Sequence, residues 1–145
     1  MRTKVGNTFG GHNYDVQNFS MTLTALTAAD GASNTLMVSE KFVPANLYSG
    51  SHWADYTGWA VGWDTDTVRS TVSYPTVPSP LKDYPIPDQG SAAWVDAGWA
   101  FGSAHPAGLN CLFGDGSVRH IAYGIDRRTW NALGHASDGI AVTLP

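Results

Sequence analysis

The stretch LNCLFGDGSVRHIAY, residues 109–123, contains the clearest structural signal in the chain. A mostly apolar run, Leu109–Phe113, is followed by Gly114-Asp115-Gly116 and then by a second run, Val118–Tyr123. Asp-Gly between two apolar runs is typical of a tight hairpin, because glycine adopts positive φ at no steric cost. We therefore expect two antiparallel strands here, with Asp115 hydrogen-bonded to the backbone of the turn.

Further elements are predicted on both sides of this hairpin. Residues 34–43 and 59–63 each contain an apolar run that favours a strand, and residues 140–144 favour a short last strand. Asp126 can cap a helix over Arg127–Leu133 that Gly134 closes. Residues 75–90 contain five prolines, which predicts an extended surface loop. Residues 1–19 are polar and rich in Gly and Asn, so we expect a loop or a loosely held first strand.

The composition favours one β-rich domain. The chain has 145 residues, of which only 14% are charged, 16 are Gly and 6 are Trp, and Glu40 is its single glutamate. Few Lys and Glu residues argue against exposed helices, whereas Gly, Asp, Thr and aromatic residues suit short strands joined by turns. We expect a single α+β domain over residues 1–145, mostly β, with an antiparallel sheet, short helices and long loops.

The charge pattern excludes several partners. The formal net charge is −4 and the eight Lys and Arg residues are scattered, so no nucleic-acid partner is expected. No apolar segment reaches the roughly 18 residues of a membrane helix, so we expect no membrane contact by this chain itself. Residues 1–11 lack the pattern of an export signal. Cys111 is alone in an apolar run and is expected to be a buried, inert thiol.

Few residues suggest chemistry. The five histidines never fall at helical zinc spacing, so no cofactor is expected, and a zinc site assembled from distant residues is left as the alternative. Asp64 and Asp66 could contribute oxygen ligands to calcium, but the glycine and the final acid of a calcium loop are missing, and a polar turn with solvated acids is favoured. The tryptophans could stack against sugars, although most are needed for the core. Glu40 is interpreted as a carboxylate paired with a nearby Arg at the end of a strand.

His105, Asp115 and Gly116 form the most distinctive group. If Leu109–Phe113 is one extended strand with a rise of about 3.3 Å per residue, the His105 and Asp115 side chains lie roughly 20 Å or more apart. They then cannot share a metal or act as an acid–base pair. We expect Asp115 to shape the hairpin turn and His105 to anchor the turn before the strand. A hydrolase that uses His105 and Glu40 remains the enzymatic alternative to a non-enzymatic domain.

The same residues carry a family resemblance. His105, nine residues and Asp115-Gly116 resemble the H-x9-DG signature of a bacterial family known as prepilin-type processing-associated (domain of unknown function 1559). Residues 102–110, 113–119 and 62–69 resemble further blocks of that family, and residues 130–139 resemble its closing segment. The stretch DGASNTLMVSE, residues 30–40, is similar to its "DGTSNTxxVxE" motif and adds Gly31, Asn34 and Glu40 to the motif residues. The matches cover roughly residues 20–143.

The resemblance implies a pilin-like globular head related to type II secretion pseudopilins. It implies a place at the cell envelope or outside the cell, partners that are other pilin-like subunits, and action by assembly or display rather than catalysis. A carbohydrate- or calcium-binding extracellular module is the alternative. Complete members of the family begin with an apolar helix, and nothing before Ser20 resembles it, so a fragment or a truncated gene product is expected.

Overall fold

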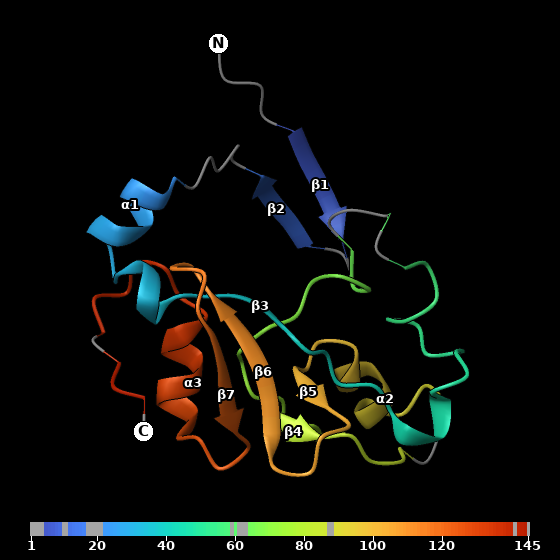
Figure 1. The fold of residues 1–145 in the computed structure, drawn as a ribbon. Helices are drawn as coiled ribbons and strands as arrows, with labels where there is room; N and C mark the ends of the chain where they lie inside the picture. Colours follow the sequence, from blue (N-terminus) through green and yellow to red (C-terminus); the bar gives the residue numbers. More distant parts are fainter. Residues whose placement is uncertain are drawn as a thin grey trace.

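In the computed structural model, the described residues are 5–9, 12–16, 22–58, 60, 64–86, 89–140 and 142–144. Short strands and helices alternate with long irregular segments, as Figure 1 shows. In chain order the elements are β1 Val5–Phe9, β2 His12–Val16, α1 Leu23–Ala28, η1 Ala32–Asn34, β3 Leu36–Ser39, η2 Ala45–Leu47, β4 Leu81–Lys82, α2 Ala92–Ala97, β5 Gly102–Ser103, β6 Gly108–Phe113, β7 Val118–Ala122 and α3 Arg127–Leu133.

The main sheet has three antiparallel strands in the order β3-β6-β7, so β6 is central (Figure 1). Strands β1 and β2 form a separate antiparallel pair, and β4 pairs with β5 over two parallel positions. The α+β class with an antiparallel sheet and short helices is therefore confirmed.

The β6–β7 hairpin closes at the predicted turn. The Phe113 N–H donates to the Ser117 carbonyl at 2.9 Å, and the Gly116 N–H donates to the Phe113 carbonyl at 2.9 Å. Gly116 has φ +82°, in the region that residues with a Cβ rarely adopt. The turn chemistry thus sets the register that pairs Leu112 with Val118 and Leu109 with Ile121.

This register divides β6 between two faces. Its core-facing residues Leu109, Cys111 and Phe113 are almost completely buried, whereas Asn110 is exposed. They pack with Trp130 and Leu133 of α3, whose bounds agree with the predicted helix. The Asp126 carboxylate accepts the Thr129 N–H at 3.0 Å, which is the cap that the sequence predicts. Alternation along the strand and one capped helix account for the main core.

A second core lies under the loops between β3 and β5. It contains Phe42, Val77, Ile86, Ala97 and Ala100, all buried. Two isolated bridges, Lys41 with Phe101 and Ser70 with Ala100, hold the surrounding segments together. Helix α2 was not predicted from the sequence, although Ser91 provides a signal for it: the Ser91 hydroxyl accepts the Trp94 N–H at 3.1 Å as an N-cap.

Several predicted boundaries were wrong. Residues 140 and 142–144 form no strand; instead Val142 and Leu144 pack against the main core from an irregular segment. The strand expected over 34–43 is limited to β3 and has a register shift between Leu36 and Val38. The proline-rich loop contains the short strand β4. The predicted strand over 59–63 lies outside the described residues except for Ala60, which is not in a strand.

Gly108 allows the close approach of β6 to β7, because it has no Cβ. A Cβ at this position would lie 2.1 Å from the Ile121 carbonyl oxygen, so Gly108→Ala must move the strand backbone. We expect this change to lower the free energy of unfolding by about 2–3 kcal/mol, as overpacking does. Urea denaturation measures the loss.

Gly124→Ala is the matched control, because a Cβ there would meet nothing within 4 Å and the residue has no positive φ. It should be neutral or stabilise the fold by about 0.5 kcal/mol. Equal losses in the two variants would contradict the steric explanation.

Candidate functional site

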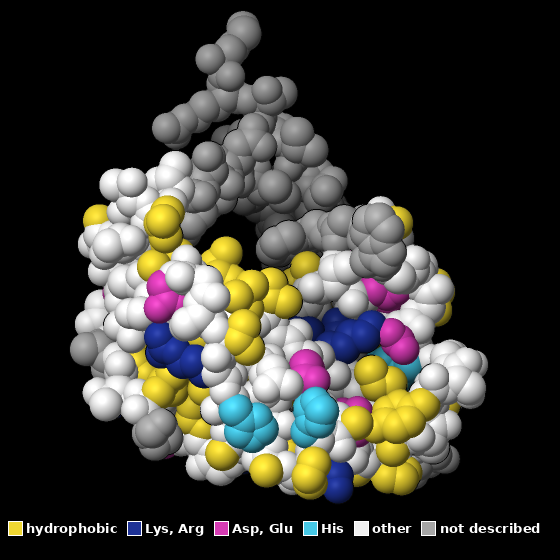
Figure 2. Space-filling view, in the orientation of Figure 1, with side chains coloured by type: hydrophobic (Ala, Val, Ile, Leu, Met, Phe, Trp, Pro, Cys, Tyr) yellow, Lys and Arg dark blue, Asp and Glu magenta, His cyan; other side chains and the backbone are white. Residues whose placement is uncertain are grey.

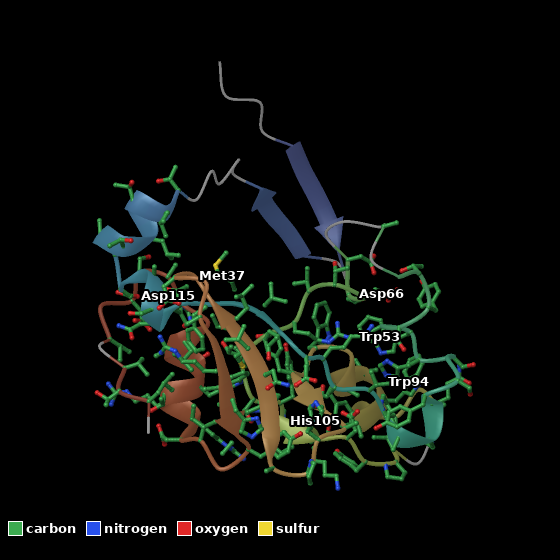
Figure 3. The ribbon with its side chains drawn as sticks, in the orientation of Figure 1. Met37, Trp53, Asp66, Trp94, His105 and Asp115 are labelled. Carbon is green, nitrogen blue, oxygen red and sulfur yellow. The ribbon has the colours of Figure 1, made fainter. Side chains whose placement is uncertain are left out.

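The structure places His105 and Asp115 at opposite ends of β6, as Figure 3 shows. They share no hydrogen bond or ion pair in the part of the chain that is described. Each side chain belongs to a separate set of contacts, so the two do not form one reactive centre.

His105 is brought together with Glu40, which directly follows β3. The Glu40 Oε1 atom lies 3.2 Å from His105 Nε2, and Oε2 accepts the Asn110 N–H at 2.6 Å. The expectation of an arginine partner for Glu40 was therefore wrong. The chain separation between Glu40 and His105 explains the error, because no local pattern relates them. Both side chains are partly exposed, at 35% and 55%.

The backbone around His105 is also held in place. Its N–H donates to Ser103 Oγ at 3.2 Å, and its carbonyl accepts the Tyr123 hydroxyl at 2.9 Å. The Ser103 carbonyl also lies 2.9 Å from this hydroxyl, so the two carbonyls share its single proton. These contacts anchor the turn that precedes β6 to the segment after β7.

Asp115 serves the hairpin turn. Its Oδ1 accepts the Ser117 N–H at 2.9 Å and the Ser117 hydroxyl at 2.6 Å, and Oδ2 accepts from Arg119 at 3.3 Å. The hydrogen bonds from Ser117 hold the pKa of this carboxyl below its ordinary value. Arg119 in turn lies over the Phe113 ring, 4.4 Å from its centroid. Both oxygens of the Asp115 carboxylate therefore accept hydrogen bonds from residues of the same hairpin.

Gly31 and Asn34 shape the segment that supports this turn. Gly31 has φ +94°, its carbonyl accepts the Asn34 N–H at 3.0 Å, and Asn34 Nδ2 donates to the Asp30 carbonyl at 3.0 Å. The resulting η1 turn offers the Ala32 carbonyl to the Asp115 N–H at 3.1 Å. Two motifs that are far apart in sequence therefore meet at one end of the sheet.

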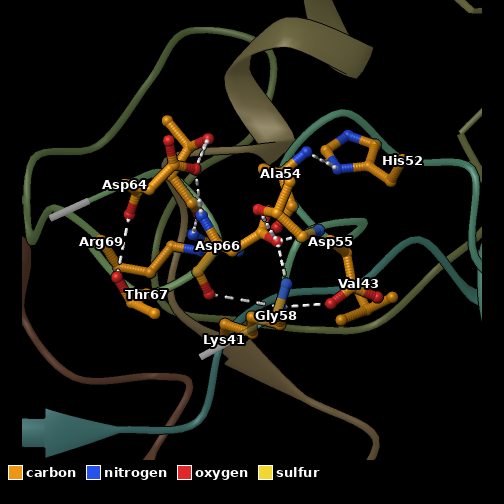
Figure 4. A network of polar contacts seen from close by, with 12 residues as sticks. Lys41, Val43, His52, Ala54, Asp55, Gly58, Asp64, Asp66, Thr67 and Arg69 are labelled. Carbon is orange, nitrogen blue, oxygen red and sulfur yellow. Dashed lines mark hydrogen bonds and ion pairs between the residues drawn. The ribbon is translucent and has the colours of Figure 1, made fainter. Parts of the chain in front are cut away.

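The carboxylates of Asp64 and Asp66 are hydrogen-bonded within the fold, whereas the sequence predicted solvated acids in a polar turn. Asp66 is only 6% exposed, and its Oδ2 accepts the Thr57 hydroxyl at 2.5 Å, the Gly58 N–H at 2.6 Å and the Thr57 N–H (Figure 4). Burial alone would raise the pKa of Asp66, but these hydrogen bonds outweigh it and hold the pKa low. Asp64 Oδ1 accepts the Asp66 N–H at 3.2 Å. Both carboxylates stabilise the loop, and a calcium site here stays a prediction.

Lys41 and Arg69 complete this polar network, which no local sequence pattern predicts (Figure 4). Lys41 Nζ pairs with Asp55 Oδ1 and donates to the Asp66 carbonyl at 3.4 Å. Arg69 donates to backbone carbonyls, including that of Ala54 at 3.1 Å. Burial lowers the pKa of Arg69 to about 10, with nearby Asp55 and Asp66 opposing this shift.

The Cys111 thiol and the described tryptophans make packing contacts and hydrogen bonds within the fold. Cys111 is buried with Sγ 3.0 Å from Ser39 Oγ, and burial raises its pKa, as expected of an inert thiol. Trp130 lies in the main core. Trp53 packs at 65° against Trp99, with centroids 5.7 Å apart, and donates Nε1–H to the Trp94 carbonyl at 3.0 Å. Sugar stacking on these rings stays a prediction.

Metal-binding clusters and membrane-spanning helices are both absent from the described residues. Among residues 22–58, 60, 64–86, 89–140 and 142–144, no three His, Cys, Asp or Glu side chains gather as they would around a metal ion. Within the described helices, none combines the length and apolar character needed to cross a membrane.

Comparison with known proteins identifies the family. The sequence profile described as "Protein of unknown function (DUF1559)", SBP_bac_10, matches residues 8–128. The chain belongs to the DUF1559 family. This match covers the residues of the Glu40–His105 pair and of the Asp115 turn, so the predicted membership of the DUF1559 family is confirmed, whereas the H-x9-DG designation and the resemblance of residues 130–139 stay predictions. No curated protein and no solved structure matches the chain.

The Glu40–His105 pair is expected to contribute a modest coupling. Glu40→Gln retains an acceptor for the Asn110 N–H but removes the carboxylate next to the ring, and His105→Ala removes the ring. A double-mutant cycle by urea denaturation should give a coupling of about 0.2–1 kcal/mol, as measured for other partly exposed pairs. A coupling that cannot be distinguished from zero would contradict a stabilising contact between the two side chains.

Asp66 is expected to contribute more, because it is buried. Asp66→Asn weakens three charge-assisted hydrogen bonds and should lower the free energy of unfolding at pH 7 by roughly 1–3 kcal/mol. Since its folded pKa is depressed, the contribution is complete above the unfolded pKa and is lost as pH falls through the folded pKa. Below about pH 4, wild-type stability should therefore fall more steeply than that of the variant.

Asp64→Asn is the control for this comparison, since its carboxylate makes longer contacts in the same turn. It should cost less stability at pH 7 than Asp66→Asn. Parallel acid unfolding curves for wild type and Asp66→Asn would show that the buried carboxylate carries no pH-dependent stabilisation.

Proposed function

We propose that this domain is a non-enzymatic, pilin-like globular head of an exported or surface protein, which acts by assembly or display with other pilin-like subunits. The observation that carries the proposal is an apolar row across the open face of the main sheet. Val38, Leu112 and Val118 stand opposite one another on β3, β6 and β7. Val38 and Val118 are 60% and 68% exposed, and Leu112 is partly buried.

The position of this row explains why it favours assembly. The opposite face of β6, formed by Leu109, Cys111 and Phe113, is already covered by α3. A sheet with one covered face normally carries polar residues on its solvent side. Aligned valines and leucine on the open side are instead typical of a surface that contacts another chain. In Figure 2 hydrophobic side chains gather at the centre of the visible face.

The contacts of the motif residues support the non-enzymatic part of the proposal. Asp115 and Asn34 bond to nearby backbone or turn side chains, and Glu40 bonds to His105 and to the Asn110 N–H. These side chains join separate segments of the fold. A scaffold that presents a surface requires such contacts, and it does not require a nucleophile next to a base.

Cysteine cross-linking in the native host tests the proposal. In Val118→Cys the new thiol lies in the apolar row, while Cys111 stays buried. We expect a short bis-maleimide linker added to intact cells to give a covalent dimer of this chain, because each copy offers one accessible thiol. The reaction on intact cells also tests exposure at the surface.

Ser137→Cys is the matched control at an exposed position in the carboxy-terminal segment. It should label on intact cells but cross-link far less. The proposal fails if Val118→Cys cross-links no better than this control, or if both thiols react only after lysis.

A further inference from the structure

A pocket of about 320 Å³ opens beside β3, apart from the Glu40–His105 pair. Its apolar wall includes Met37, Val38 and Phe101, and its polar wall includes Lys41, Asp66 and Arg69. The register shift between Leu36 and Val38 interrupts the alternation of β3, and the consecutive residues Met37 and Val38 are both more than half exposed. In Figure 2 Lys and Arg side chains lie beside the central hydrophobic patch.

The two cations of the polar wall have capacity for an anion. Arg69 donates to the carbonyls of Thr65, Val68 and Ala54, and none of these acceptors is a carboxylate. Its Nε is buried and has no hydrogen-bond partner among the described residues. The carboxylates of Asp55 and Asp66 lie near Arg69, but its hydrogen bonds go to neutral carbonyls, so the guanidinium can still pair with a further carboxylate. Lys41 places a second cation in the same wall, although Asp55 pairs with it from outside the lining.

Asp66 requires a hydrogen-bond donor from the ligand, whereas Lys41 and Arg69 require an anion. This residue is 94% buried, since 6% of its surface is exposed, and its Oδ2 is occupied by Thr57 and Gly58. Its Oδ1 is buried without a hydrogen-bond partner in the described part of the chain. A buried acceptor without a donor is costly, so an N–H group brought to this wall would stabilise it. A ligand that matches this pocket would therefore combine a carboxylate with an N–H donor.

We propose that this pocket binds the carboxyl-terminal residue of a peptide that ends in an apolar amino acid. The terminal carboxylate pairs with Lys41 and Arg69, and the amide N–H donates to Asp66. The apolar side chain packs on Met37, Val38 and Phe101. The volume suits one residue with its amide group. This site goes beyond the proposed assembly role.

Three small probes separate the parts of this recognition. N-acetyl-leucine carries the carboxylate, the amide N–H and the apolar side chain, N-acetyl-leucinamide lacks the carboxylate, and hexanoate lacks the N–H. Amide chemical shifts of the 145-residue chain should report saturable binding of N-acetyl-leucine, with roughly tenfold weaker binding of each of the other two. Equal binding of the three probes, or no saturable shift up to about 20 mM probe, overturns the proposal.

Two valine substitutions locate the site. Val38 and Val118 are similarly exposed and lie in the same row of the sheet, but of the two it is Val38 that lines the pocket. Val38→Asp should weaken N-acetyl-leucine binding by roughly tenfold, because it adds a negative charge beside the carboxylate. Val118→Asp should leave binding unchanged. Equal effects of the two substitutions overturn the assignment, and Met37→Glu gives the same test if Val38→Asp does not fold.

Discussion

The antiparallel register between β6 and β7 is the constraint on which the rest of this structure depends. The turn at Gly114–Gly116 decides which residues stand opposite one another, and so decides which side of β6 faces α3. A shift of one residue would bring Asn110 and Leu112 to the core and expose Phe113. Gly116 supplies the positive φ, and Asp115 satisfies the donors of Ser117. Local turn chemistry thus determines which residues of β6 and β7 enter the main core.

Polar contacts between distant segments supplement this small sheet. The Asp30 carboxylate accepts the Gly139 N–H at 2.9 Å across 109 positions of sequence, and Glu40 accepts the Asn110 N–H across 70. The chain contains one cysteine, so it has no internal disulfide that could perform this task. Charge-assisted hydrogen bonds to backbone groups contribute more than neutral ones and orient the segments that they join. The motif residues are best understood as these connections.

The two faces of the main sheet have different consequences for function. One face is buried against Trp130 and Leu133 of α3. The other face presents the row of Val38, Leu112 and Val118. At the β3 end this row meets the pocket whose polar wall contains Asp66 and Arg69. Atoms of these two residues are buried without partners among the described residues, in contrast to the occupied oxygens of Asp115. The proposed assembly surface and the proposed peptide pocket therefore adjoin each other.

The sequence by itself determined the elements whose signals are local. These are the β6–β7 hairpin with its Asp-Gly turn, the helix α3 with its Asp126 cap, and the α+β class with long loops. Each depends on residues within a few positions of one another, where backbone preferences and caps act directly. The tertiary structure alone decided the pairing of Glu40 with His105, the burial of Asp66 and the absence of a strand over residues 142–144. An ion pair needs a partner that the fold brings from another segment, a carboxylate is buried only where distant loops supply donors, and a strand exists only where a neighbour has a free edge for it.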